Sequence, residues 1–348
     1  MSTVYVLGAG ASAGYRGSFI GETSPVSKNF FQKANRVMPL HTINGRNFND
    51  ENINYQHLFN FIEKYWGVNQ CSISTSHVNI DMEEVLTLLH IELEEKPDSQ
   101  TLKKACQEYM LLMALTFDKI LTGLPCPDHQ KIANNLRPGD AVISFNYELL
   151  MDNSLMATSN WHPGDGYGVK CSLLSAGKCT DFGDKSSVHL YKLHGSLNWL
   201  YCTHCRKLFT AVETVENKLR FICNHSDKVL CNHMGCRHPL LPIIIPPTMM
   251  KNYDSIPFTQ KLWRLARNAL ANARHIIIIG YSFPPTDFRT KWLFRKAMFE
   301  SNTPRKVTLV NHATGDKLEK LLQQYSDLMR TEDVKSFSTI ADYAASLP

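Results

Sequence analysis

The chain has 348 residues, 43% of them hydrophobic, which is enough to bury a large core in one domain with insertions or in two domains. Its 37 Lys and Arg residues against 32 Asp and Glu residues give a net charge of +5 with no long basic run, so charge neither requires nor excludes a nucleic-acid partner. No window holds the roughly 18 apolar residues of a membrane span, and the start MSTVYVLGAGAS lacks the basic residues of an export signal. Ten cysteines without such a signal indicate a reducing compartment, so we expect a cytoplasmic protein with no membrane partner.

The first half of the chain reads as one strand, a long loop and a group of helices. Thr3–Leu7 is a β-rich run that ends in glycine, as a buried parallel strand does. Residues 18–54 are irregular, with one short helix at most, and loops of this length are often functional. Apolar residues then recur at helical spacing over 55–66, 82–95 and 102–121, with Asp81 as a cap for the second helix. We predict an all-helical insertion over 55–137.

The second half alternates strands and helices. Strand character returns at 140–145, 188–193, 241–245, 275–279 and 306–310, and helical spacing at 259–273, 288–299 and 316–325. The alternation from residue 259 onward is typical of a parallel sheet with crossover helices. A cysteine-rich stretch at 199–239 interrupts the pattern as a second, smaller insertion. The predicted fold class is α/β, with a mostly parallel sheet.

Four short segments read as the end of a buried strand followed by a polar turn. They are GAGAS at 8–12, SFNYE at 144–148, KLHGS at 192–196 and IIIIGYSF at 276–283. Ligands of doubly wound α/β sheets bind in the crevice outside the carboxyl ends of the strands. The four turns together therefore predict a nucleotide-binding site that also holds catalytic residues.

The first of these turns fits the pattern G-x-G-x-x-G/A, with Gly8, Gly10 and Ala13 at the defining positions. Such glycines let backbone N–H groups approach a pyrophosphate at the start of a helix, although a tight structural turn remains the alternative. Dinucleotide folds place an acidic residue after the second strand, roughly 20 residues further on. Here that region is the irregular loop, and Glu22 is not at a strand end, which disfavours a plain dehydrogenase.

Asn146 and His194 are the candidates for chemistry because each directly follows a predicted strand. An imidazole can act as a base near neutral pH, and an Asn amide can orient a water or a hydroxyl without adding charge. A helix cap is the alternative for Asn146, and a structural core or turn histidine is the alternative for His194. No Ser or Cys lies in a G-x-S-x-G context, which disfavours acyl-enzyme chemistry.

The cysteine-rich stretch predicts a structural zinc site. A CxxC pair followed some 25 residues later by a second pair is typical of a zinc ribbon, and a closed four-thiolate site leaves no position for water. The favoured ligands are Cys202, Cys205, Cys231 and Cys236. Because four residues rather than two separate the second pair, Cys223, His225 and His233 are alternative ligands. The alternative to a metal site is a loop with free thiols.

With these segments in this order, the sequence resembles the sirtuin-like family, in particular its bacterial branch of NAD-consuming proteins of antiviral defence. The segments that carry the resemblance are GAGAS, DMEEVLTLL at 81–89, SFNYE, KLHGSLNWLYCTHC at 192–205, LLPIIIPPTMMK at 240–251, IIIIGYSF and VTLVN at 307–311. The resemblance implies a Rossmann-like, NAD-binding domain over residues 1–348 with a helical module and a small zinc module.

The resemblance also implies roles for single residues. Asn146 would contact the nicotinamide ribose and the attacking water, and His194 would be the catalytic base. Asn311 would reach the adenine ribose, and Arg16 has a counterpart near the nicotinamide pocket. The remaining NAD-binding residues are Gly8, Ala9, Gly10 and Ser12 for the pyrophosphate, and Gly280, Tyr281 and Ser282 for the phosphate and adenosine side.

Three departures separate this chain from the sirtuin deacylases. Residues 13–17 (AGYRG) replace the segment that covers the nicotinamide pocket, and residues 243–250 replace the segment that supports an acyl-lysine peptide. Glu148 ends the triplet Asn-Tyr-Glu where deacylases have Asn-Ile-Asp. These losses favour water over a protein lysine as the acceptor.

The leading functional hypothesis is therefore an NAD glycohydrolase that releases nicotinamide and ADP-ribose, as the regulated effector of an anti-phage system. A homo-oligomer, or a partner protein such as an ATPase, a nuclease or an Argonaute-like protein, could regulate it. The alternatives are an NAD-dependent protein deacylase and a module that binds NAD or ADP-ribose without turnover. Direct nucleic-acid binding would rest only on five basic residues near the zinc ribbon and is not expected: Arg206, Lys207, Lys218, Arg220 and Arg237.

Overall fold

Six parallel strands form the central sheet of the computed structural model, which describes residues 2–37, 55–73, 78–175, 178–180, 185–210, 230–245, 257–283, 287–301 and 305–348. The strands lie in the order β11-β10-β9-β1-β2-β5, and every neighbouring pair is parallel. Their bounds are β1 Thr3–Leu7, β2 Ala141–Ser144, β5 His189–Lys192, β9 His275–Ile279, β10 Lys306–Val310 and β11 Val334–Phe337. The predicted α/β class with a parallel sheet is confirmed.

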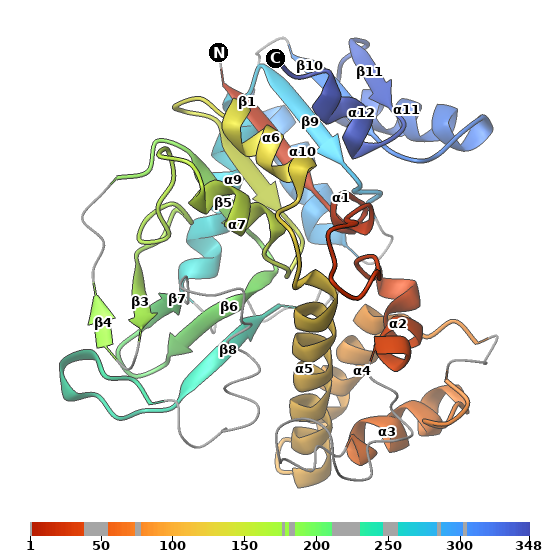
Figure 1. Ribbon diagram of the computed structural model, residues 1–348, viewed down its shortest axis with the longest axis vertical. Helices are drawn as coiled ribbons and strands as arrows, with labels where there is room; N and C mark the ends of the chain where they lie inside the picture. The colour runs from red at the N-terminus through yellow and green to blue at the C-terminus, as the bar shows by residue number, and fades with distance from the viewer. Residues whose placement is uncertain are drawn as a thin grey trace.

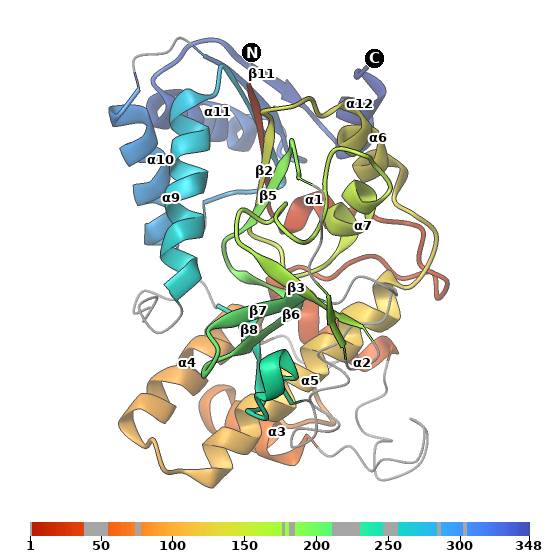
Figure 2. The same cartoon turned by 90° about the vertical axis from the view of Figure 1, so that its left-hand side faces the viewer.

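The inner strands are continuous apolar runs because helices cover both faces of the sheet. In β1 and β9 the last four residues of each strand are buried. Figure 2 shows α9, α10 and α11 on one side of the sheet and α6, α7 and α12 on the other. Their bounds are α6 Pro127–Asn135, α7 Leu150–Met156, α9 Pro257–Asn272, α10 Phe288–Phe299, α11 Asp316–Met329 and α12 Ile340–Ala345.

A group of helices lies beside the sheet at the lower right of Figure 1. It comprises α2 Phe30–Val37, α3 Gln56–Trp66, α4 Met82–Glu95 and α5 Gln100–Leu121, and α5 contacts the other three. Helix α4 begins where the sequence predicts, because the Asp81 side chain accepts hydrogen bonds from the backbone N–H groups of Glu83 and Glu84. The segment before α2 contains a short 3₁₀ helix, Ser27–Asn29, and residues 38–54 of the expected loop lie outside the described residues.

A second sheet of five strands, in the order β4-β3-β7-β6-β8, lies beside these helices at the lower left of Figure 1. Its strands are β3 Cys171–Ser175, β4 Lys178–Thr180, β6 Gly195–Cys202, β7 Lys207–Thr210 and β8 Leu240–Ile244. The strand expected at 241–245 thus exists as β8, but it pairs antiparallel with β6 in this second sheet. The inner side of the sheet shares one apolar cluster with the helices, including Leu200, Phe209 and Leu112.

Not every helix within residues 55–137 belongs to the group beside the second sheet. Helix α6, which falls inside the range expected for the helical insertion, packs against α7 and α12 beside the central sheet. None of the described helices combines the length and the apolar character needed to cross a lipid bilayer.

Candidate functional site

The turns that follow β1 and β9 interlock through glycines. The Gly8 N–H donates to the Ile279 carbonyl at 2.9 Å, and the Gly10 N–H donates to the Gly280 carbonyl at 3.0 Å. A Cβ added to Gly10 would lie 2.6 Å from Gly280 Cα, so the two backbones touch directly. The N–H groups that the sequence suggested for a pyrophosphate therefore join the two turns. The glycines satisfy a packing requirement as well as lining the site.

Gly280 should tolerate substitution least among the glycines of these turns. It has a φ of +63°, and a Cβ there would lie 2.3 Å from the Gly10 carbonyl carbon. We expect Gly280→Ala to lose about 1–2 kcal/mol for the left-handed backbone and about 1–3 kcal/mol more for overpacking. Urea unfolding measures this. The matched control is Gly21→Ala, where φ is +71° but a Cβ would meet nothing within 4 Å. Equal losses in the two variants would contradict the interlocked packing.

The side chain of Asn146 is held by three acceptors. Its Nδ2 donates to the Gly8 carbonyl at 3.0 Å, to Ser12 Oγ at 3.2 Å and to Glu148 Oε1 at 3.1 Å. Because Nδ2 is used in this way, Oδ1 is the atom of Asn146 that can accept a hydrogen bond from a water or a ribose hydroxyl. The helix-cap alternative is not supported, because the next helix, α7, starts only at Leu150.

The Glu148 carboxylate holds Asn146 and Ser12 in place. Its Oε1 accepts from Ser12 Oγ at 2.5 Å, its Oε2 accepts from the Leu150 N–H at 2.5 Å, and the residue is 5% exposed. The acid that departs from the deacylase triplet is thus committed to orienting Asn146 and Ser12. The Ser12 hydroxyl, which the sequence assigned to a pyrophosphate, is engaged in the same network.

A buried ion pair supports the turn that carries these residues. Lys192, at the end of β5, donates through Nζ to the Glu148 carbonyl at 2.6 Å and to Asp152 Oδ2 at 2.9 Å. The Tyr167 hydroxyl donates to the other Asp152 oxygen at 2.6 Å. A buried charge is stable only when it is paired and hydrogen-bonded, and here both conditions are met. The pair fixes the position of the turn after β2 relative to β5.

His194 lies between the two sheets, directly before β6. The Leu193 N–H continues the parallel ladder by donating to the Ser144 carbonyl, and the His194 carbonyl accepts from Ile245 at 2.8 Å. The following residue must be glycine, because Gly195 has a φ of +84° and a Cβ there would lie 2.1 Å from the Ile243 carbonyl oxygen. This turn holds His194 between β2 and β8.

The imidazole of His194 is packed among aromatic rings and faces a carboxylate. Its ring centroid lies 5.2 Å from that of Phe145 and 6.2 Å from that of Tyr147. Its Nε2 lies 3.7 Å from Asp287 Oδ2, and the His194 side chain is 3% exposed. A buried imidazole next to a carboxylate is an arrangement that can take up a proton.

All four strand-end turns meet at one cavity of about 320 Å³, between the edge of the central sheet and the helices. The wall opposite the sheet comes from residues 24–28, from residues 81–83 at the start of α4 and from Phe117 of α5. The charged side chains on the lining are mostly acidic. They are Asp81, Glu83, Glu148 and Asp287, with Lys28 as the lysine and His194 as the titratable imidazole.

Most of the residues named from the sequence lie together on this lining: Gly8, Ala9, Gly10, Ser12, Asn146, His194, Gly280, Tyr281 and Ser282. Two do not. Arg16 is exposed, after α1 (Ala9–Ala13), and does not line the cavity. Asn311 follows β10 but is likewise absent from the lining, and its Oδ1 accepts from the Ala313 N–H at 2.9 Å.

Two residues of the lining, Asp287 and Glu148, contact the candidate catalytic residues although the sequence did not assign them to the site. Asp287 was not singled out, although an Asp directly before a helical run is a recognisable cap signal, and it does cap α10 through Thr290. Glu148 was noted only as a departure from the deacylase triplet. Its bond to Ser12 depends on β1 and β2 lying side by side, which no local pattern reveals.

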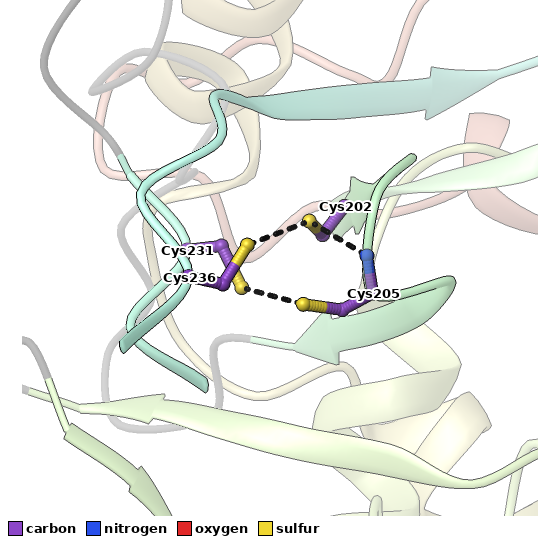
Figure 3. A group of neighbouring side chains, drawn as sticks. All are labelled: Cys202, Cys205, Cys231 and Cys236. Atoms are coloured by element: carbon purple, nitrogen blue, oxygen red, sulfur yellow. Dashed lines mark hydrogen bonds between the residues drawn. The ribbon is translucent and has the colours of Figure 1, made fainter. Parts of the chain in front are cut away.

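The four favoured cysteines form one cluster at the outer end of the second sheet (Figure 3). Their sulfur atoms lie within 4.8 Å of one another, and the pairs Cys202–Cys236 and Cys205–Cys231 are each separated by 3.8 Å. Zn–S bonds of about 2.3 Å in a tetrahedron place sulfurs roughly 3.8 Å apart, so the donor set fits a structural zinc. The cysteines make no disulfide.

The alternative ligands divide into two groups. His233 lies in the 3₁₀ helix His233–Gly235, between the second pair of cysteines, and is not a member of the cluster. Cys223 and His225 lie outside the described residues. The spacing x4 of the second pair is accommodated because the short helix loops out between Cys231 and Cys236.

Comparison with models of known protein families and with curated proteins gave no match. The architecture itself is consistent with a sirtuin-like fold. In chain order, β3 and β4 of the small sheet lie between β2 and β5 of the parallel six-stranded sheet, and its other strands, with the four-cysteine cluster, lie between β5 and β9.

Proposed function

We propose that this protein is an NAD glycohydrolase, which cleaves NAD to nicotinamide and ADP-ribose. The observation that carries the proposal is the meeting of an oriented amide, Asn146, and a buried imidazole, His194, on one cavity with the glycine turns of β1 and β9. The volume of about 320 Å³ falls in the range of roughly 300–1,000 Å³ that ligand pockets occupy.

The charge of the lining suits cleavage of the glycosidic bond between ribose and a cationic nicotinamide ring. The nicotinamide ring of NAD carries a positive charge, and the transition state for its loss resembles an oxocarbenium ion. Buried carboxylates stabilise such developing positive charge. Glu148 and Asp287 lie on the same cavity as Asn146 and His194, so a ribose bound there would experience a negative field.

The steps that this chain would supply are then few. Nicotinamide leaves as a neutral molecule that takes the electron pair of the C–N bond, so no acid is needed to protonate it. Asn146 Oδ1 would orient the attacking water, and His194 would take the proton that this water loses as its oxygen bonds to the ribose carbon. Water is favoured over an acyl-lysine because residues 243–250 replace the segment that supports an acyl-lysine peptide in the deacylases.

Incubation with NAD, with and without an acetyl-lysine peptide, tests the proposed reaction. We expect equimolar nicotinamide and ADP-ribose from NAD alone, at a rate that the peptide does not raise. Chromatography with mass detection quantifies both products. Acceleration by the peptide together with an acylated ADP-ribose would indicate a deacylase. Binding of NAD without any product over hours would indicate a non-catalytic binding module.

An enzyme that consumes NAD freely would harm its own cell, so we propose that its activity is regulated, as expected for an effector of antiviral defence. A homo-oligomer, or a partner of the ATPase, nuclease or Argonaute-like kind, would be the regulator. The wall formed by residues 24–28 is a suitable point of control because it lines the same cavity as the residues proposed for catalysis.

A further inference from the structure

Asp287 is a buried carboxylate whose position is fixed by its neighbours. It is 2% exposed, directly precedes α10 and caps that helix, with Oδ1 3.2 Å from the Thr290 N–H. Its Oδ2 accepts from the Tyr281 hydroxyl at 2.6 Å and from Thr290 Oγ1 at 2.7 Å. The same oxygen lies 3.7 Å from Nε2 of His194. Asp287 therefore stands between the helix start, the turn after β9 and the imidazole.

The donors around Asp287 favour its charged form. Hydrogen bonds to a carboxylate stabilise the ionised state. Burial, and next the Asp287 charge, hold the pKa of Tyr281 well above its usual value, so the phenol stays protonated and keeps donating. Tyr281 is itself fixed, because its ring stacks on Phe145 with centroids 4.5 Å apart. These contacts fix the charged carboxylate of Asp287 next to the imidazole of His194.

The side of the imidazole on which Asp287 lies determines what His194 can do. A carboxylate next to Nε2 favours the tautomer with its proton on Nε2, which leaves the lone pair on Nδ1. Hydrogen bonds of catalytic groups are often long in the absence of substrate and shorten when it binds. A movement of roughly 0.5–1 Å would bring the 3.7 Å approach into the range of such a bond.

We propose that Asp287 is a positioning residue for His194, which orients its imidazole and stabilises the imidazolium formed when His194 takes a proton from the attacking water. The inference rests on the proposed hydrolase function for its catalytic consequence. The effect of the Asp287 carboxylate on the basicity of His194 does not depend on whether the protein turns NAD over. On the described lining of the same cavity, the other titratable groups are Tyr281 after β9, Tyr147 and Glu148 after β2, and Lys28, Asp81 and Glu83 on the opposite wall.

The test is an NMR titration of the His194 ring in the substrate-free protein, for the wild type and for Asp287→Asn. Asn is a good helix cap, so α10 should keep its start. An opposite charge within about 4–6 Å shifts a pKa by roughly 1–3 units, so the variant should lower the His194 pKa by about 1 unit or more. Asp316→Asn, at the exposed first turn of α11, is the matched control and should leave it unchanged.

Kinetics give the second readout. A base acts only when unprotonated, so the rate falls below its pKa; the acidic limb of the pH–rate profile should therefore move to lower pH in Asp287→Asn. The kcat should fall by roughly 10²-fold or more, while KM for NAD changes little, because the residue acts through His194. A purely structural role would lower kcat by instability without moving the limb.

The outcomes separate this inference from the proposed function. An unchanged His194 pKa in a folded Asp287→Asn variant overturns the role of Asp287, whether or not the protein hydrolyses NAD. A lowered pKa in a protein without NAD turnover supports the pairing and refutes only the hydrolase. Should Asp287→Asn not fold, Tyr281→Phe removes one donor from the carboxylate and should raise the His194 pKa; no change or a fall would overturn the inference.

Discussion

His194→Ala and Asn146→Ala should each lower the rate of nicotinamide release from NAD by roughly 10²- to 10⁴-fold, the usual contribution of a general base or of an oriented reactant. His194 would be lost as the group that takes the proton. Asn146 would be lost as the group whose Oδ1 holds the water, while Ser12 and Glu148 would keep their mutual hydrogen bond.

Both losses should appear in kcat rather than in binding. Calorimetry should give a Kd for NAD within a few-fold of the wild-type value, because most of the lining, including the glycine turns, is unchanged. His312→Ala, an exposed histidine beyond β10, is the control for the removal of an imidazole and should retain full activity. Wild-type turnover in His194→Ala and Asn146→Ala would refute the assignment of the site.

Loss of one zinc ligand should have the second large effect, on stability. Structural zinc contributes roughly 10–16 kcal/mol of apparent binding free energy in small zinc domains, and this binding is linked to folding. Cys231 and Cys236 precede β8, and Cys202 ends β6, so the metal would hold the outer ends of these two paired strands together. We expect Cys231→Ser to lose zinc and to lower the Tm by many degrees.

The activity should fall in the same variant for a structural reason. His194 directly precedes β6, and its carbonyl bonds to Ile245 at the end of β8, so fraying of this strand pair would loosen the imidazole. Metal analysis and thermal unfolding measure the two effects, with Cys71→Ser, an exposed cysteine outside the cluster, as the matched control. A Cys231→Ser variant with wild-type zinc content and Tm would show that the cluster holds no structural metal.

The central sheet could be predicted because its strands have a recognisable local sequence pattern. β1 and β9 are apolar runs that end in glycine, and burial on both faces is what produces such runs. The zinc ligands could be predicted for a similar reason, because CxxC followed by a second pair is a local pattern with a strict geometric cause.

The second sheet was missed because its pairing is not local. β6 is fully buried and reads GSLNWLYC, with Ser, Asn and Tyr among its apolar residues. Its partner β7 lies within the cysteine-rich stretch, and its partner β8 follows directly after it. Without knowledge of those partners, the polar residues conceal the strand. The Ser196 and Asn198 side chains in fact bond to each other within it.

The candidate site shows the same division between local and non-local information. Each strand-end turn could be recognised by itself, and the carboxyl edge of the sheet brings all four to one cavity. The contacts of Asp287 with His194 and of Glu148 with Ser12 join segments that are distant in the sequence, so only the fold reveals them. Arg16 and Asn311, whose roles were implied by the resemblance alone, do not line the cavity.

The most direct test of the account is a mass-balanced time course of NAD with the wild-type protein and with Asn146→Ala. The account predicts that the wild type converts NAD into equal amounts of nicotinamide and ADP-ribose without any acceptor peptide, and that Asn146→Ala binds NAD but leaves it intact. NAD that stays intact with the wild-type protein, in every oligomeric fraction, would contradict it.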